Sequence, residues 1–179
     1  MLYINILFYP LFALLDFAVA HIVATVFVNW WAPAFAGNIP YSDRGVTKQG
    51  YKLPGWLAWF DTFDADLDQG VRDGSISGDS TYWNRVGWLY RNRAYGFSYW
   101  VLGIEFVPAN WRVIRADDDL FLAVANGYFS VHIKNFAGIQ WKFGWKAWND
   151  YDRTTQEWPT KPWGPVWRVP FVFSVSRSK

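Results

Sequence analysis

Three aspartates occupy alternate positions in the segment Asp64-Ala65-Asp66-Leu67-Asp68, and Gly70 follows two residues later. Carboxylates at alternate positions before a glycine are how calcium loops direct oxygen ligands to one side of a tight turn. An EF-hand loop needs glycine at its sixth position and glutamate at its twelfth, whereas Gly70 is seventh here and Ser75 is twelfth. The segment therefore predicts a looser Ca²⁺ or Mg²⁺ site formed by Asp64, Asp66 and Asp68, or a solvated acidic loop that faces nearby arginines.

Other catalytic arrangements find little support in the sequence. A divalent-metal-dependent hydrolase could use the same aspartates, but no lysine or glutamate stands at a spacing that supports catalysis. Ser130 and His132 share the polar face of a predicted strand, but no G-x-S-x-G motif accompanies them, so we expect His132 to face solvent. The chain has no cysteine, which excludes disulfides and thiolate chemistry. We predict no catalytic residue and interpret the protein as non-enzymatic, with the hydrolase as an alternative.

Aromatic and basic residues alternate in the segment that follows the acidic loop. Tryptophan and tyrosine dominate protein-interface hot spots, and this chain is 22% aromatic with 14 tryptophans. Single-stranded nucleic acid is a weaker alternative, because the formal net charge is only +2 and the acidic loop is close in sequence. Internal contacts with aspartates and aromatic rings would explain the same arginines. The candidate binding residues are Arg85, Trp88, Arg91 and Tyr95.

Residues 1–36 carry one formally charged side chain, Asp16, and the run Leu11–Trp31 is long enough to cross about 30 Å of hydrocarbon as a helix. We predict a transmembrane helix, with Trp30 and Trp31 in an interfacial belt. A cleaved signal peptide and a buried helix of a soluble protein are the alternatives. Asp16 and His21 are costly in lipid and, being five residues apart, do not share a helix face. They favour a headgroup position, an oligomer contact through the helix, or a proton relay.

The charges beside this helix predict its orientation. Arg44, Lys48 and Lys52 follow it, while no lysine or arginine precedes it. The positive-inside bias therefore places the C-terminal part in the cytoplasm.

The remaining sequence predicts an α+β fold. We divide the chain into an apolar membrane segment (1–36), a linker rich in glycine and polar residues (37–52) and one domain (53–179). Helical spacing predicts short helices over 53–63 and 82–92. Alternation of apolar and polar residues then predicts an antiparallel sheet with strands over 99–106, 111–115, 120–125, 128–134, 139–148 and 167–176, and a proline-containing loop over 149–165. We expect the strands over 128–134 and 139–148 to form a hairpin, with the last strand paired to it as a third or edge strand.

Three stretches resemble an uncharacterised family encoded by tailed bacteriophages. They are the LPxWLxWF pattern from Leu53 to Phe60 with Asp64 after it, the WLYRNxAYGF pattern from Trp88 to Phe97, and Phe143-Gly144-Trp145-Lys146. The family has no assigned activity, so the resemblance implies a small phage-encoded protein and no catalytic residues.

Together these features predict a membrane-anchored phage protein at the inner membrane of the infected bacterium, contacting lipid and a host or phage protein. The alternative is a virion or assembly component whose apolar N-terminus packs against other subunits.

Overall fold

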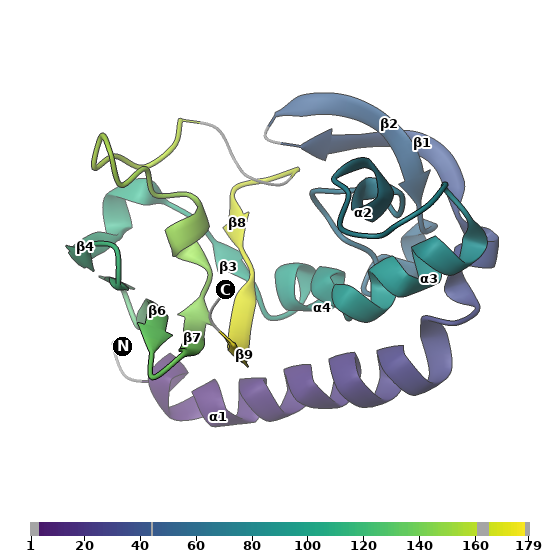
Figure 1. Cartoon of the computed structure of the whole chain (residues 1–179). Helices are drawn as coiled ribbons and strands as arrows, with labels where there is room; N and C mark the ends of the chain where they lie inside the picture. The colour runs from purple at the N-terminus through teal and green to yellow at the C-terminus, as the bar shows by residue number, and fades with distance from the viewer. Residues whose placement is uncertain (1–3, 44, 161–164, 178–179) are drawn as a thin grey trace.

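A long apolar helix runs along one side of the domain in the computed structural model, which describes residues 4–43, 45–160 and 165–177 (Figure 1). Its first part is α1 (Ile4–Phe17), and it continues directly as the π-helix η1 (Ala18–Val28). Asn5–Val28 is the one helix of the described residues that is long and apolar enough to cross a membrane, by length and composition alone. The helix therefore exists as predicted, but it lies against the domain rather than apart from it.

The segment expected to be an irregular linker forms a β-hairpin instead. After the short 3₁₀ helix η2 (Ala32–Phe35), strand β1 (Gly37–Asp43) pairs antiparallel with β2 (Val46–Lys52). The sequence did not indicate strands here because its glycines and polar residues show no alternation. The hairpin is stabilised at its base, where Lys52 reaches the acidic segment that follows.

Short helices follow the hairpin. The predicted helix over 53–63 is wrong, since only the 3₁₀ turn η3 (Gly55–Leu57) forms there, and α2 (Gln69–Arg72) is a single turn. The helix predicted over 82–92 is confirmed as α3 (Tyr82–Arg91), with the Thr81 hydroxyl accepting a hydrogen bond from the Asn84 N–H at 3.3 Å. Helix α4 (Tyr95–Trp100) takes the first two residues of the strand predicted over 99–106, of which only Ile104–Glu105 forms a strand.

Gly96 explains why α4 can form at this place. A Cβ atom on Gly96 would lie 1.9 Å from the carbonyl oxygen of Ala58, so only glycine allows the helix to approach the turn after η3. The Gly96 N–H donates to the Asp61 carbonyl at 2.8 Å, which fixes α4 against the acidic segment. A tertiary contact thus decides the conformation of a segment that favours a strand by its aromatic residues.

The largest sheet has five antiparallel strands in the order β4-β5-β6-β7-β9. The predicted hairpin of β6 and β7 is confirmed, and the last strand pairs with β7 at the sheet edge as expected. A two-stranded ladder of β3 and β8 and two 3₁₀ turns, η4 and η5, complete the described residues. The bounds are β3 (Ile104–Glu105), η4 (Pro108–Asn110), β4 (Arg112–Ala116), β5 (Leu120–Ala125), β6 (Tyr128–Phe136), β7 (Ile139–Trp145), η5 (Ala147–Asn149), β8 (Arg168–Val169) and β9 (Phe171–Arg177).

Two hydrophobic cores form, and the N-terminal helix contributes to both. One lies against the sheet and contains Trp145, Phe171 and Phe121, with Ala20 and Ala24 from η1 packed into it. The other lies around η3 and α3 and receives Val28 from the end of η1. The observed fold is α+β, with an apolar N-terminal helix, short helices and antiparallel sheets, as the sequence predicted.

Candidate functional site

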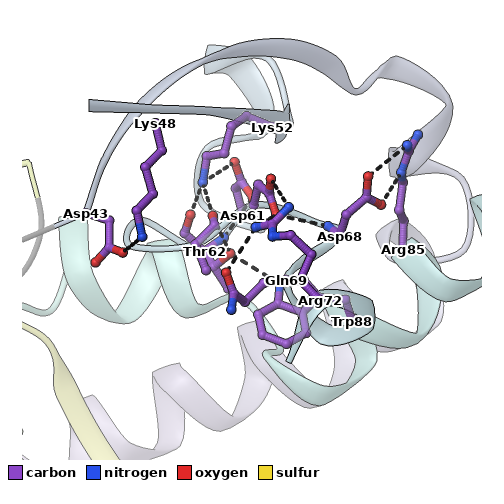
Figure 2. A network of polar contacts seen from close by, with 12 residues as sticks. Asp43, Lys48, Lys52, Asp61, Thr62, Asp68, Gln69, Arg72, Arg85 and Trp88 are labelled. Carbon is purple, nitrogen blue, oxygen red and sulfur yellow. Dashed lines mark hydrogen bonds and ion pairs between the residues drawn. The ribbon is translucent and has the colours of Figure 1, made fainter. Parts of the chain in front are cut away.

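The predicted metal ligands contact basic side chains. The buried Asp66 carboxylate accepts from both terminal nitrogens of Arg72, at 2.8 and 2.6 Å, and Asp68 accepts from Arg85 at 2.7 and 3.1 Å (Figure 2). Asp64 acts electrostatically on Lys146 and favours its charged form. Among the described residues, no three histidine, aspartate or glutamate side chains are grouped so that they could hold a metal ion. The Ca²⁺ or Mg²⁺ site remains a sequence prediction, and the chain's own arginines neutralise two of its three carboxylates.

A further ion pair links the hairpin to the same segment. The Lys52 ammonium lies 2.9 Å from the Asp61 carboxylate, and both side chains are buried (Figure 2). Asp61 also accepts from the N–H groups of Leu53 and Thr62. Burial raises the pKa of Asp61, while Lys52 opposes this shift. This network explains why the polar segment 61–68 is ordered, and it has a structural role.

The four predicted binding residues do not form one surface. Arg85 is held by Asp68 and lies 3.5 Å above the ring of Tyr51, and Trp88 is buried with its indole N–H donating to Thr62. Arg91 donates to the hydroxyl and carbonyl of Ser75. The Tyr95 hydroxyl accepts from Lys146 at 2.8 Å. Arg85 and Trp88 therefore support the fold, whereas Arg91 and Tyr95 line a cavity described below.

The face of the N-terminal helix that contacts the domain packs into both cores and also makes polar contacts. The Tyr9 hydroxyl donates to the Val172 carbonyl at 2.8 Å and accepts from the Gly144 N–H at 3.1 Å. Asp16 accepts from the Ser98 hydroxyl at 2.5 Å. Beyond the end of η1, the buried Asn29 amide donates to the Leu89 carbonyl at 3.1 Å. These contacts are spread along the whole helix and hold it lengthwise on the domain.

The opposite face of the helix is exposed and almost entirely apolar. Leu7 and Leu14 are the most exposed of its side chains, at 78% and 65%. The exposed apolar residues from Ile6 to Trp30 form what we call the outer face: Ile6, Leu7, Phe8, Leu11, Leu14, Leu15, Phe17, Ile22, Val23, Val26, Phe27 and Trp30. A helix on the surface of a water-soluble domain instead presents polar residues outward.

The remaining predicted membrane residues lie at the edges of this outer face. His21 is exposed, stacks on Phe17 and lies 3.2 Å from the Arg93 guanidinium. The Trp30 carbonyl accepts from the Tyr82 hydroxyl at 2.5 Å, while the Trp31 ring stacks on Trp56. Asp16 and His21 thus point in different directions, as their spacing predicted. Arg44, one of the three charges used to predict orientation, lies outside the described residues.

A basic cavity of about 300 Å³ lies between the N-terminal helix, the junction of α3 with α4, and strands β7 and β9. Four cationic side chains line it, and Asp16 is the one carboxylate in its wall. We call it the basic pocket; its cations are Arg91, Arg93, Lys142 and Lys146.

The environment of the basic pocket disfavours the charged forms of its two lysines, Lys142 and Lys146. Burial lowers the pKa of Lys142, and the neighbouring Lys146 lowers it further. Burial also lowers the pKa of Lys146, an effect that Asp64 and Asp150 oppose. The sequence does not indicate this site because Lys142 and Lys146 alternate with apolar residues along the predicted strand 139–148, a pattern typical of solvent-facing positions. The signal that could have indicated it was Asp16, a carboxylate in an apolar helix that needed a polar partner.

Ser130 and His132 occupy alternate positions of β6, and both are buried. The His132 ring lies next to Trp148. The Ser130 hydroxyl and both ring nitrogens of His132 lack a hydrogen-bond partner within the described part of the chain. Burial lowers the pKa of His132 to about 4, and four nearby cations add to the effect. The pair occupies the core beneath the sheet, so the sequence expectation of a solvent-facing histidine is wrong.

Comparison with known proteins identifies the family but no activity. The chain belongs to a family of unknown function, DUF7338, whose sequence model matches residues 1–179. This agrees with the expected membership of an uncharacterised family. Neither the curated proteins nor the solved structures contain a match to the chain.

Proposed function

We propose that the protein attaches to a lipid bilayer through the outer face of its N-terminal helix, with the α+β domain lying flat on the membrane surface. The observation that carries this proposal is that the helix is apolar on both sides: one face packs into the two cores of the domain, and the opposite face leaves its large apolar side chains exposed. Twelve large apolar residues form the outer face, eleven on the continuous helix of α1 and η1 and Trp30 just after its end. A contiguous apolar patch of this kind marks a membrane or protein contact.

An in-plane helix fits the contacts better than a spanning one. If α1 and η1 crossed the bilayer while docked, Arg93 and Lys146 would enter the hydrocarbon region with the domain. Each charge there costs at least about 2.5 kcal/mol. An interfacial helix instead buries one apolar face at the boundary of headgroups and acyl chains. Trp30, at the end of the outer face, is the residue type that favours this boundary.

The bacterial inner membrane, the cytoplasmic side, a phage origin and a partner protein remain predictions from the sequence. The same outer face could instead contact a second copy or another subunit, which is the assembly alternative. Lipid is favoured here because the face is long, continuous and without charged side chains among the described residues. Interfaces between proteins usually add a polar rim and complementary charges.

The experiment is flotation of the full chain with phosphatidylcholine vesicles. Wild type should float, and Leu7→Glu combined with Leu14→Glu should remain in the soluble fraction. Each leucine contributes roughly 1.5–3 kcal/mol of apolar transfer, so the double variant should lose about a hundredfold or more in partitioning.

The matched control is Val46→Glu, which adds a charge at an exposed valine near the tip of the β1–β2 hairpin, away from α1 in Figure 1. It should float like the wild type. Wild type that stays soluble as a dimer or larger oligomer would refute lipid attachment and support the assembly alternative.

A further inference from the structure

The basic pocket has more positive charge than the proposed attachment requires. Attachment through the outer face needs only apolar contact, yet four cations surround a cavity of about 300 Å³ beside the helix. Elsewhere the described residues pair such charges directly, as Arg72 with Asp66 and Arg85 with Asp68. None of the ion pairs found among the described residues involves a cation of the pocket.

The contacts made by these cations are mostly with neutral groups. Arg91 donates to Ser75, Arg93 lies against the His21 ring, and Lys146 donates to the Tyr95 hydroxyl. Lys142 is half-buried between β9 and the pocket, next to Lys146. Asp16 is occupied by the Ser98 hydroxyl, while Asp64 and Asp150 act on Lys146. Cations packed together in this way gain stability from an added anion.

The donors that line the cavity suit a tetrahedral anion. Guanidinium groups bind phosphate with two parallel hydrogen bonds, and a lysine ammonium adds a point charge with three donors. Arg91 and Arg93 are exposed at the rim, whereas Lys142 and Lys146 are partly buried inside. Phe171, Val172 and Phe173 of β9 supply an apolar wall beside these donors.

We propose that the basic pocket binds a phosphate group, with Lys142 and Arg93 as its principal donors. The phosphate belongs either to a lipid headgroup or to a soluble phosphate ester, and the lipid source rests on the proposed function. Arg93 touches His21 at the edge of the outer face. A phosphate in the pocket would therefore sit beside the helix, at headgroup height when the outer face contacts acyl chains.

The test has a soluble arm and a vesicle arm, both with the full chain at constant ionic strength. In the first, inorganic phosphate and glycerol 3-phosphate are titrated while thermal unfolding is followed. In the second, flotation is compared between phosphatidylcholine vesicles and vesicles that also contain phosphatidic acid. The variants are Lys142→Gln and Arg93→Gln, and the matched control is Arg112→Gln, an exposed arginine on β4 outside the pocket.

We expect phosphate to raise the melting temperature, and Lys142→Gln and Arg93→Gln each to weaken this response at least tenfold. Arg112→Gln should stay within twofold of wild type. If phosphatidic acid also strengthens flotation in wild type but not in Lys142→Gln, the phosphate comes from a lipid. A soluble response without a vesicle effect assigns a soluble ester.

The proposal is overturned if neither arm responds, or if Arg112→Gln loses as much as Lys142→Gln, which would indicate general charge attraction. Binding to phosphatidylcholine alone tests membrane attachment separately, because those vesicles carry no net charge. The experiment therefore distinguishes a refutation of phosphate binding in the pocket from a refutation of membrane attachment through the outer face.

Discussion

The two faces of the N-terminal helix differ in what covers them. The inner face places Tyr9, Asp16 and the small residues Ala20 and Ala24 against the domain, and the outer face presents leucine, phenylalanine and valine. A helix that evolved for water would expose its polar residues. The difference teaches that the domain covers one face of the helix and provides partners for its polar groups, and it supports the proposal that lipid covers the other face.

The strongest way to break the inner contact is Gly144→Ala. Gly144 has φ of +88°, and a Cβ there would lie 2.1 Å from the Phe129 carbonyl, at the point where its N–H donates to Tyr9. Left-handed strain and the clash together should cost about 4 kcal/mol. Chemical denaturation measures this loss, and Gly138→Ala, which is also at positive φ but has open space, should lose only the strain. Equal losses in the two variants would contradict the close approach.

His132, on strand β6 of the sheet, should cause more of the loss of folding stability at low pH than the contacts of the N-terminal helix do. The folded protein holds the pKa of His132 near 4, below its ordinary value of 6.5, because burial disfavours the imidazolium. The unfolded chain therefore binds the extra proton first, so this stability is present above about pH 6.5 and is lost as the pH falls toward 4.

The contribution of His132 to the free energy of unfolding between these pH values is at most about 3 kcal/mol. Melting temperatures of wild type and His132→Asn between pH 7 and 4.5 measure it. The pH dependence should be flatter in the variant, and parallel curves would show that His132 is not the group responsible.

A matched pair of enlargements compares the two faces directly. Ala24 is fully buried and Val23 is exposed, although they are neighbours on η1. Ala24→Leu should overpack the core and cost roughly 2 kcal/mol, while Val23→Leu should change the free energy of unfolding by less than about 0.5 kcal/mol. Equal effects of the two substitutions would contradict the orientation of the helix, in which Ala24 faces the domain and Val23 faces away from it.

The smallest expected effect comes from Tyr9→Phe. This change removes the hydroxyl that joins the helix to Val172 and Gly144 but keeps the ring against Phe129 and Phe171. The loss should be about 1–2 kcal/mol, because one backbone donor and one acceptor lose their partner. Urea denaturation measures it, and an unchanged midpoint would show that ring packing alone docks this end of the helix.

Local patterns predicted part of this structure well. The alternation of Phe129, Val131 and Ile133 with Ser130 and His132 indicated β6, and the hydrophobic stripe of α3 indicated a helix. The α+β class and the apolar N-terminal helix followed from the same kind of signal. The pairing of β9 with β7 was also expected, since both strands alternate.

The functional features were harder to predict because they depend on contacts between distant segments. The basic pocket combines Arg93 with Lys142, which are far apart in sequence, and no spacing rule connects them. Asp66 and Asp68 pair with arginines from α2 and α3, and the pattern of the acidic segment did not indicate these partners. The docking of the helix likewise required Ser98 and Leu89.

The most direct test of the central claim is the depth of the outer face in a bilayer. The chain has no cysteine, so single cysteines can be introduced at Leu7, Leu14 and Val26 and labelled with a nitroxide probe. Attachment in the membrane plane predicts that all three labels lie at the same shallow depth in vesicles. Labels that stay as accessible to water as in buffer would contradict membrane attachment, and a label at Leu14 far deeper than the other two would contradict the in-plane arrangement.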